Sequence, residues 1–417
     1  MSDFPYPGLR PFRRDETDIF FGREEQVDQL LERLDQSRFL AVVGPSGCGK
    51  SSLVQAGLFA ALETGFLVSA GVRWRTAKTR PGTCPMRHLA KALVKKSALG
   101  PERGEDDESA AFLLATLRRG PLGLIDALSM TLLPQGTNLL ILVDQFEEIF
   151  RYRQQYSLDE AEAFVALLLA ATQQKTLPVY VVITMRSDFL GDCALFRGLP
   201  EAIDEGQFLT PRLSREQCRA AIIGPAEVFG GEVEQALVNR LLNDMGEDSE
   251  QLPLFQHALM RMWREAGKRA EHPILTLGDY EAIGGLENAL SNHADEAFEE
   301  LDEKQKTIAE VLFRSLSERS ESLRDTRRPS RLSEIVKVAG VHPEQVKEVV
   351  DIFRRPDRSF LTPPAGIPLT SETIIDISHE SLIRLWKRLN TWVEVEADSA
   401  DTYIPVPASA RPIITSI

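Results

Sequence analysis

The sequence has few cysteines and no long apolar run. Its four cysteines are scattered over 417 residues, and none forms a C-x-x-C pair. This spacing argues against a disulfide framework or a cysteine zinc site, and it fits a reducing cytoplasm. No run of about 18 apolar residues is present, so we expect no membrane-spanning helix. The first residues also lack the charged-then-apolar order of a secretory signal.

Positive charge is in deficit as well. There are 48 Lys and Arg against 62 Asp and Glu, a net charge of −14. This argues against a generally basic nucleic-acid-binding protein, although it leaves room for a local basic patch. Hydrophobic residues make up 43% of the chain, which is enough to bury cores, and the length indicates about two to four domains.

Residues 39–52, FLAVVGPSGCGKSS, predict a phosphate-binding loop between a buried strand and a helix. Glycines allow a tight turn whose N–H groups point at anionic oxygens, and the start of the helix adds its positive end. In the pattern G-x-x-x-x-G-K-S, we expect Lys50 to reach the β- and γ-phosphates and the Ser51 hydroxyl to bind Mg²⁺. The predicted loop consists of Gly44, Pro45, Ser46, Gly47, Cys48, Gly49, Lys50, Ser51 and Ser52.

A second informative stretch, residues 139–150, reads LLILVDQFEEIF. Its apolar run predicts a strand buried on both faces, and Asp144 follows at the C-terminal end, where parallel α/β folds bind ligands. We expect Asp144 to hold Mg²⁺ and either Glu147 or Glu148 to polarise the attacking water as general base. The alternative is that these acids only begin the following helix, whose dipole favours them.

Further strands are predicted at residues 66–75 and 179–184. The second of these leads to Arg186, which either senses the γ-phosphate or pairs with Asp188. Strands alternate with helices over residues 38–210, and this order predicts a parallel α/β sheet. Before the phosphate loop, Phe20 and Phe21 are either a hydrophobic anchor or a cover for a nucleotide base.

The pattern changes after residue 210. Residues 214–223, 232–244 and 252–266 predict helices with no strand between them. Further helices follow, closed by two strands at 360–362 and 373–377, which is typical of a winged helix. We expect an extended segment at 1–17, a P-loop NTPase domain at 18–210, a helical domain at 211–285, a winged-helix domain at 286–395 and a flexible tail at 396–417.

Taken in order, these motifs resemble the STAND class of signalling NTPases and, more narrowly, the bacterial novel STAND NTPases of the first type. YPGLRPF with FFGRE resembles the opening of that group, VDQFEEIF its Mg²⁺ and base motif, and TMRSDF its sensor-arginine strand. QLPLFQHAL resembles its helical-domain motif on the adenine side, and ISHESLIRLW its winged-helix motif. The resemblance covers about residues 5–395.

The resemblance implies a cytoplasmic switch, with ADP held between three domains. Exchange for ATP would open the chain and permit homo-oligomerisation, and slow ATP hydrolysis would reset it, in stress or phage-defence signalling. Either an effector or sensor is supplied by another chain, or this is a shortened form. Gln145 stands where many relatives carry a second acid, so the base stays open between Glu147 and Glu148. The implied adenine contacts are Phe21, Gly22, Arg23 and Pro253; Arg186 is the γ-phosphate sensor, and His379 reaches the phosphates and, with Pro253, keeps the closed state.

A rival interpretation is a DNA-binding winged-helix regulator or an initiator-like ATPase. It rests on two groups of arginines, which are either a DNA-reading surface or solvated faces. A lone histidine such as His379 is, on the residues alone, either structural or a ligand contact. A small-molecule kinase would need an acceptor site and a lid, and no motif for either is present. The arginines are Arg324, Arg327, Arg328 and Arg331, and then Arg354, Arg355 and Arg358.

Overall fold

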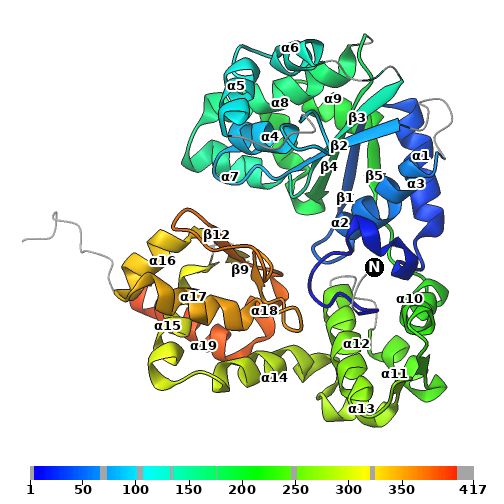
Figure 1. Cartoon of the computed structure of the whole chain (residues 1–417), viewed down its shortest axis with the longest axis vertical. Helices are drawn as coiled ribbons and strands as arrows, with labels where there is room; N and C mark the ends of the chain where they lie inside the picture. The colour runs from blue at the N-terminus through cyan, green and yellow to red at the C-terminus, as the bar shows by residue number, and fades with distance from the viewer. Residues whose placement is uncertain are drawn as a thin grey trace, which may run out of the picture. The chain divides into compact units, whose positions relative to one another are not determined.

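The chain is described here by a computed structural model (Figure 1), and its contacts divide it into two compact units. The first comprises Met1–Pro5 and Pro11–Leu252, and the second comprises Tyr6–Arg10 and Pro253–Ile417. The structure describes residues 4–65, 73–100, 107–131, 134, 136–174, 176–245, 251–319 and 325–401.

A five-stranded sheet in the order β2-β3-β4-β1-β5 forms the centre of the first unit. All of its neighbouring strands run parallel, which confirms the predicted α/β sheet. The inner strands are buried along their length because their residues are almost all apolar. The strands are β1 (Phe39–Gly44), β2 (Arg73–Thr79), β3 (Thr137–Val143), β4 (Val179–Arg186) and β5 (Gln207–Leu209).

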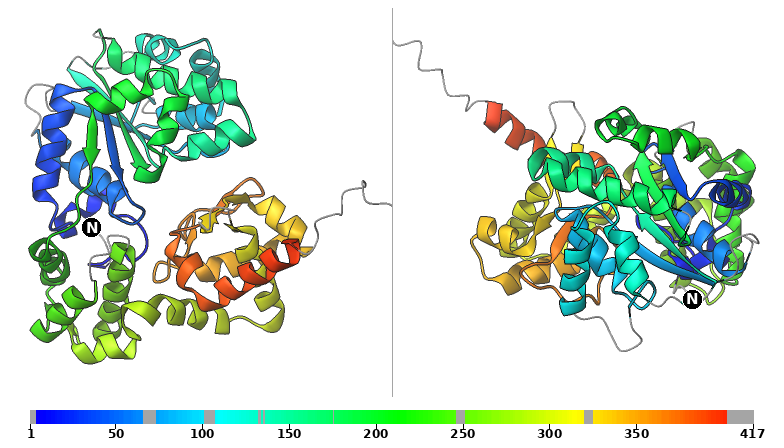
Figure 2. Two further views of the ribbon diagram at one scale, coloured as in Figure 1. Left: turned by 180° about the vertical axis from the view of Figure 1, so that it is seen from behind. Right: turned by 90° about the horizontal axis from the view of Figure 1, so that it is seen from above.

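Helices cover both faces of this sheet (Figures 1 and 2). Alternate residues of a strand point to opposite faces, so Val43 and Ile141 join one apolar core while Val42 and Leu140 join the other. The first core is shared with α4 (Pro85–Leu93), α5 (Asp107–Leu117), α6 (Gly123–Met130), α7 (Glu148–Gln155), α8 (Leu158–Gln173) and α9 (Leu199–Glu205), and the second with α1 (Glu24–Gln36), the π-helical turn η2 (Leu53–Leu58) and α3 (Phe59–Glu63).

Three predictions about secondary structure need correction. Residues 66–72 lie outside the described residues, and β2 continues to Thr79, beyond the predicted end. A 3-10 helix, η1 (Arg14–Ile19), occupies part of the predicted extended segment, because the Glu16 carboxylate caps it by accepting from the Arg13 N–H. The short strand β6 (Glu232–Val233) lies between α10 (Arg215–Val228) and α11 (Gln235–Asp244), where only helix is predicted.

The second unit is mostly helical and contains small antiparallel sheets. The two predicted strands are present within one residue as β11 (Leu361–Thr362) and β12 (Ile374–Ile377), and they pair antiparallel. A third strand, β10 (Ser330–Arg331), pairs with β12, and β8 (Ser317–Arg319) pairs with β9 (Asp325–Arg327). The other elements are α12 (Leu252–Gly267), β7 (Ile274–Leu275), α13 (Leu277–Ala282), α14 (Gly285–Glu299), α15 (Glu303–Ser315), α16 (Leu332–Ala339), α17 (Pro343–Phe353), α18 (Ser381–Leu385) and α19 (Lys387–Asp401).

An aromatic core holds this unit together. Trp386 is completely buried, and its ring meets Phe313 edge-on with the ring centroids 4.9 Å apart. Helix α19 continues to Asp401, into the segment predicted to be a flexible tail, while residues 402–417 lie outside the described residues. None of the described helices combines the length and apolarity needed to cross a membrane.

Residues near the N-terminus complete the second unit. Leu9 is 3% exposed and lies in the core with Phe313, and the Tyr6 ring meets Trp263 edge-on at 6.2 Å. Gly8 has a φ of +71°, and a Cβ there would lie 2.8 Å from the Met260 sulfur. Only glycine fits both the backbone and the space at this position.

Candidate nucleotide-binding site

The predicted phosphate loop joins β1 to the short helix α2 (Lys50–Ser52). Gly47 and Gly49 have φ values of +74° and +91°, a left-handed backbone that favours glycine. A Cβ on Gly44 would lie 2.8 Å from the Cys48 sulfur. The loop therefore turns tightly, as a phosphate cradle requires.

Lys50 lies across this loop. Its ammonium Nζ donates to the carbonyl oxygens of Gly44 at 2.9 Å and Pro45 at 2.7 Å. The next residue but one, Ser52, accepts at its Oγ from the backbone N–H of Phe12 at 3.2 Å. The charge of Lys50 is thus held beside the N–H groups that a phosphate would approach.

Asp144 is the centre of the site and is completely buried just after β3. Its Oδ1 accepts from the hydroxyls of Ser51 at 2.6 Å and Thr184 at 2.8 Å, and its Oδ2 accepts from Arg80 at 3.2 Å. The structure therefore brings Ser51 and Asp144 together, the pair that the sequence predicts to hold Mg²⁺. A hydroxyl and a carboxylate oxygen are the hard ligands that Mg²⁺ prefers.

The ionisation of Asp144 reflects its neighbours. Burial raises the pKa, but the cations Arg80 and Lys78, with the Ser51 and Thr184 hydroxyls, outweigh it and lower the pKa to about 2. Asp144 is therefore a carboxylate at neutral pH, the form that binds a metal ion.

Three of these neighbours are absent from the predicted site: Lys78, Arg80 and Thr184. Lys78 donates to Gln55 Oε1 at 2.6 Å, and burial lowers the pKa of its ammonium group. A usable signal exists in the topology, since Thr79 of β2 lies opposite Val143 of β3. Residues just beyond two neighbouring parallel strands meet at one edge of the sheet.

The candidate bases lie just beyond Asp144. Gln145 has a left-handed backbone with a φ of +57°, which turns the chain out of the strand. Glu147 then occupies the N-cap position of α7, and Glu148 begins the helix while its Oε2 accepts from the Gly82 N–H at 2.8 Å. Both acids thus start a helix, as the alternative interpretation expects, and the identity of the base stays a prediction.

Arg186 ends β4 and pairs within its own segment. It donates to both carboxylate oxygens of Asp188, at 3.1 and 2.7 Å, and its guanidinium lies 5.7 Å from the centre of the Phe189 ring. The structure thus contains the Asp188 pairing, one of the two predicted alternatives. Its role as a γ-phosphate sensor remains a prediction.

The predicted adenine contacts in the first unit support the phosphate loop. Arg23 is 4% exposed and donates to the carbonyl oxygens of Cys48 at 3.0 Å and Pro211 at 2.7 Å. A Cβ on Gly22 would lie 2.5 Å from the Gln217 carbonyl oxygen, and one on Gly224 would lie 2.7 Å from the Phe21 ring. These residues anchor the loop to α10, and base contact remains a prediction for them.

Pro253 and His379 both belong to the second unit. Pro253 lies in the first turn of α12, and His379 stands between β12 and α18. The His379 Nδ1 lies 3.2 Å from the Ser381 backbone nitrogen and 2.9 Å from the Ser381 hydroxyl. Their contact with nucleotide remains a prediction.

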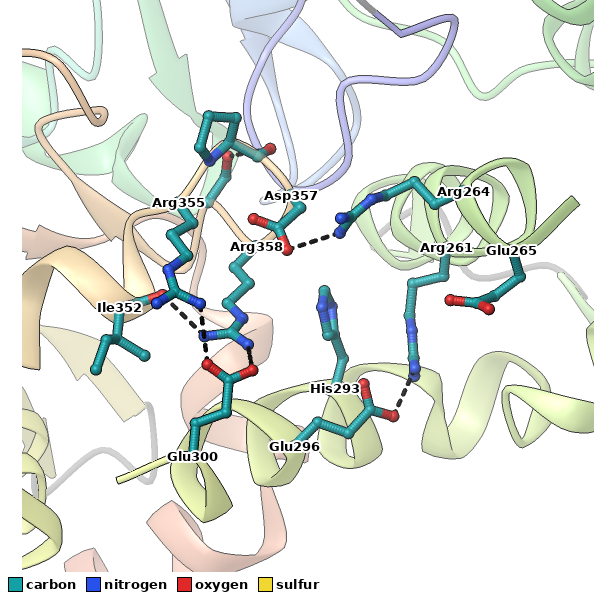
Figure 3. Close-up of polar contacts among 12 residues, drawn as sticks. Arg261, Arg264, Glu265, His293, Glu296, Glu300, Ile352, Arg355, Asp357 and Arg358 are labelled. Carbon is teal, nitrogen blue, oxygen red and sulfur yellow. Dashed lines mark hydrogen bonds and ion pairs between the residues drawn. The ribbon is translucent and has the colours of Figure 1, made fainter. Parts of the chain in front are cut away.

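The arginines of the rival interpretation are largely matched by carboxylates. Arg355 and Arg358 both donate to Glu300, and Arg358 is only 5% exposed (Figure 3). Arg354 pairs with Asp351. In the earlier group, Arg327 pairs with Asp376 and Glu380, Arg331 pairs with Glu372, Arg328 is exposed, and Arg324 lies outside the described residues.

Comparisons with known proteins address the whole chain. A family model described as novel STAND NTPase 1 matches residues 5–411. A comparison with curated proteins gives no match.

Several solved structures are similar at low identity. One is the Aeropyrum pernix ORC2 protein in its ADPNP-ADP complexes, at 14% identity and a TM-score of 0.46, over 90% of this chain and 95% of that chain. Another is the Aeropyrum pernix ORC1 protein in complex with DNA, at 15% identity and a TM-score of 0.44, over 94% of this chain and 98% of that chain. A third is Cdc6p from Pyrobaculum aerophilum, at 14% identity and a TM-score of 0.39, over 90% of this chain and 94% of that chain. Values this low carry no inference about what this chain binds.

Proposed function

The chain belongs to the novel STAND NTPase 1 family, and on that premise we propose that it is a switch controlled by ATP and ADP. ADP would hold the chain closed, exchange for ATP would open it, and slow hydrolysis would reset it. A ligand can drive such a change only through different affinities for the two states.

The observation that carries the proposal is the cluster of Ser51, Asp144 and Lys50 at the carboxyl ends of β1 and β3. The Ser51 hydroxyl oxygen lies 2.6 Å from Asp144 Oδ1, and both oxygens are suitable ligands for Mg²⁺. The Lys50 ammonium group crosses the glycine loop and donates to the Gly44 carbonyl oxygen. Bound Mg²⁺–ATP would supply the phosphoanhydride bond. Lys50 would neutralise phosphate charge, and Glu147 or Glu148 would accept a proton from water.

The closed state would depend on the second unit. We assign residues 286–395 to a winged-helix domain, supported by the antiparallel strands β10, β11 and β12 among helices. His379 would donate to a phosphate oxygen, and Pro253 would lie beside the adenine. Arg186 would sense the γ-phosphate after leaving Asp188.

Assembly and cellular context extend the same proposal. We propose homo-oligomerisation in the ATP state, a cytoplasmic location, an effector or sensor on another chain, and a role in stress or phage-defence signalling. The free thiols of all four cysteines are in keeping with a reducing compartment.

Calorimetry of nucleotide binding tests the site. Wild-type protein should bind ADP and ATP, and Lys50→Ala should weaken binding at least ~100-fold, because it removes the cation from the phosphate cradle. Lys91→Ala changes an exposed lysine and should leave the affinity unchanged. Wild-type affinity in Lys50→Ala would remove this loop from the site.

Light scattering tests the switch separately. We expect larger particles with a non-hydrolysable ATP analogue than with ADP. A monomer under both conditions, with nucleotide binding intact, would leave a nucleotide-binding protein without ATP-driven assembly. We do not propose DNA binding, because the arginines it needs are mostly paired with acids.

A further inference from the structure

Two histidines lie next to each other in the interior of the second unit. His257 of α12 is completely buried, and His293 of α14 is 5% exposed. His257 Nε2 lies 3.3 Å from His293 Nδ1. The ring of Phe360 packs on both imidazoles, with its centroid 5.9 Å from that of His257 and 5.1 Å from that of His293. The Nε2 edge of His257 is therefore closed by a second imidazole and an aromatic ring.

The other nitrogen of His257, Nδ1, lies near a different segment. It is buried and has no hydrogen-bond partner in the part of the chain that the structure describes. A Cβ on Gly8 would lie 4.0 Å from this nitrogen, so the backbone at Gly8 covers this edge of the ring. Gly8 belongs to residues 6–10, which we call the N-terminal strap and which are buried as far as Leu9.

The surroundings of the two rings determine where their protons sit. One hydrogen joins His257 Nε2 to His293 Nδ1, because the two nitrogens are close enough for a hydrogen bond. A proton on His257 Nδ1 would be a buried donor with no acceptor among the described residues, and folded proteins avoid such donors. We therefore place the proton of the neutral His257 ring on Nε2, where it is donated to His293, and leave Nδ1 unprotonated.

Burial and nearby positive charge keep both rings neutral. Burial, followed by Arg261, lowers the pKa of His257 to about 3. Burial, followed by His257 and three arginines, holds the pKa of His293 well below its usual range. The carboxylates in this region bind the arginines, as Figure 3 shows. The charged and titratable side chains come from each segment that packs here: Arg261 and Arg264 of α12, Glu296 and Glu300 of α14, Asp357 and Arg358 after α17, and Tyr6 and Arg10 of the strap.

Protonation of His257 conflicts with this arrangement. The added proton would make Nδ1 a donor that meets no acceptor in the described part of the chain, and it would place a charge beside Arg261. Opening the Nε2 edge would separate α12 from α14 and from the buried Phe360 ring. The Nδ1 edge needs only the movement of residues 6–10, after which water can hydrate the new N–H group.

We propose that His257 is a proton-sensitive seat for the strap: when its ring takes up a proton, residues 6–10 leave the second unit. At neutral pH the neutral ring keeps the strap in place. The residues on both sides of the strap belong to the first unit, so the chain passes between the units after Pro5, after Arg10 and after Leu252. Release of the strap removes the N-terminal attachment and keeps the later one.

Chemical labelling of a thiol under the strap tests the proposal without nucleotide, so its outcome does not depend on the proposed function. Met260→Cys places the thiol, because Met260 is 3% exposed and its sulfur would lie 2.8 Å from a Cβ on Gly8. A pyridyl disulfide reacts with thiols in acid as well as at neutral pH. Mass spectrometry of peptides distinguishes the new site from the four native cysteines. The labelling rate, divided by that of the unfolded chain at the same pH, gives the opening constant.

Acid should raise this opening constant through His257. The open form, with a histidine pKa near about 6.5, binds more protons than the closed form, whose His257 pKa is about 3. We expect a rise of about 10- to 100-fold between a pH of about 7.5 and a pH of about 4.5. His257→Gln keeps a donor for His293 Nδ1 but takes up no proton, so the rise should disappear. His272→Gln, at an exposed position, should leave the rise unchanged.

A second thiol separates strap release from unfolding of the whole unit. Val349 of α17 is completely buried, so Val349→Cys, combined with Met260→Cys in one chain, reports on unfolding. Local release requires an opening constant at least about 10-fold larger at position 260 than at position 349. Equal constants overturn the proposal, as does a constant that acid leaves unchanged or a rise that persists in His257→Gln. If Met260→Cys does not fold, Leu9→Cys in the strap itself takes its place.

Discussion

A buried charge cluster in the first unit and one in the second have opposite arrangements. In the first, the carboxylate Asp144 is flanked by two cations, Arg80 and Lys78, and bound by two hydroxyls. In the second, the cation Arg327 is flanked by two carboxylates, Asp376 and Glu380. In the first cluster several groups share one carboxylate, whereas in the second one guanidinium binds two carboxylates.

This difference matches different tasks. Surplus positive charge beside Asp144 suits a site that receives an anion, because the ligand completes the neutralisation. Arg327 instead binds two carboxylates at once, so a change at this one residue should affect both of them.

The largest expected effect comes from removing each arginine in turn. Arg327→Leu should lower the free energy of unfolding of the second unit by about 3–5 kcal/mol, because it removes the guanidinium that binds two largely buried carboxylates. Arg80→Leu should lower that of the first unit by only about 1 kcal/mol, since Lys78 and two hydroxyls remain. Equal losses would contradict the contrast between the clusters.

Urea unfolding with tryptophan fluorescence can resolve the units. Trp74 lies in the first unit, and the other three tryptophans, Trp263, Trp386 and Trp392, lie in the second. In a Trp74→Phe background, the fluorescence therefore reports on the second unit alone, and circular dichroism reports on both.

Acid should destabilise the second unit first. Burial, followed by Arg261, lowers the pKa of His257 to about 3. In the unfolded chain a histidine has a pKa of about 6.5. Between a pH of about 6.5 and about 3, the unfolded chain therefore binds more protons than the folded chain, so the free energy of unfolding falls as the pH drops. We expect a loss of about 2–3 kcal/mol at a pH of about 4.5. The contribution of Asp144 is present above about pH 4 and is lost only as the pH falls towards about 2, so the first unit should persist.

The variant His257→Leu checks this assignment. It should flatten the pH dependence of the second unit between about pH 6.5 and 4.5, measured by the same fluorescence. His272→Gln, at an exposed position, should leave the slope unchanged. An identical slope in both variants would assign the acid sensitivity to other groups.

Asp144→Asn sharpens the function of the first cluster. An amide of the same shape lacks the charge that a metal ion needs, so the gain in ATP affinity on adding Mg²⁺ should fall about 10- to 100-fold. Calorimetry with and without Mg²⁺ measures it, with affinity for metal-free ADP as the internal control. A full Mg²⁺ effect in this variant would exclude Asp144 as a ligand.

The smallest effect is expected at an exposed pair. Arg331→Gln breaks an ion pair with Glu372 whose side chains are 46% and 70% exposed, and should change stability by less than about 0.5 kcal/mol. A loss comparable to that of Arg327→Leu would show that the position along the strands matters more than burial.

Sequence reasoning works best where a strand is central. The strands that precede Lys50 and Asp144 are mostly apolar, and they were predicted within about two residues of their bounds. Strand β2 lies at the edge of the sheet, and its sequence RWRTAKT mixes cations with apolar residues. Edge strands are half solvated and often carry charge, so a search for apolar runs misses the end of β2 and with it Lys78 and Arg80.

Side-chain partners are harder to predict than strands. Spacing places Arg186 and Asp188 two residues apart, but it cannot decide between their mutual pair and a ligand contact. Arg327 shows the same limit, since a basic run in sequence becomes a buried ion cluster only when β9 lies near Asp376 and Glu380. Such contacts depend on tertiary packing, which periodicity does not encode.

The placement of Tyr6 and Leu9 in the second unit has a consequence for synthesis on the ribosome. These residues leave the exit tunnel before residues 253–401, yet Leu9 shares a core with Leu290 and Phe313, which are made much later. The first unit can fold before residues 253–401 are made. The second unit is complete only when residues 6–10 pack against that later segment. A fragment that begins at Pro253 would lack the buried side chains of Tyr6 and Leu9, and we expect it to expose apolar surface and aggregate.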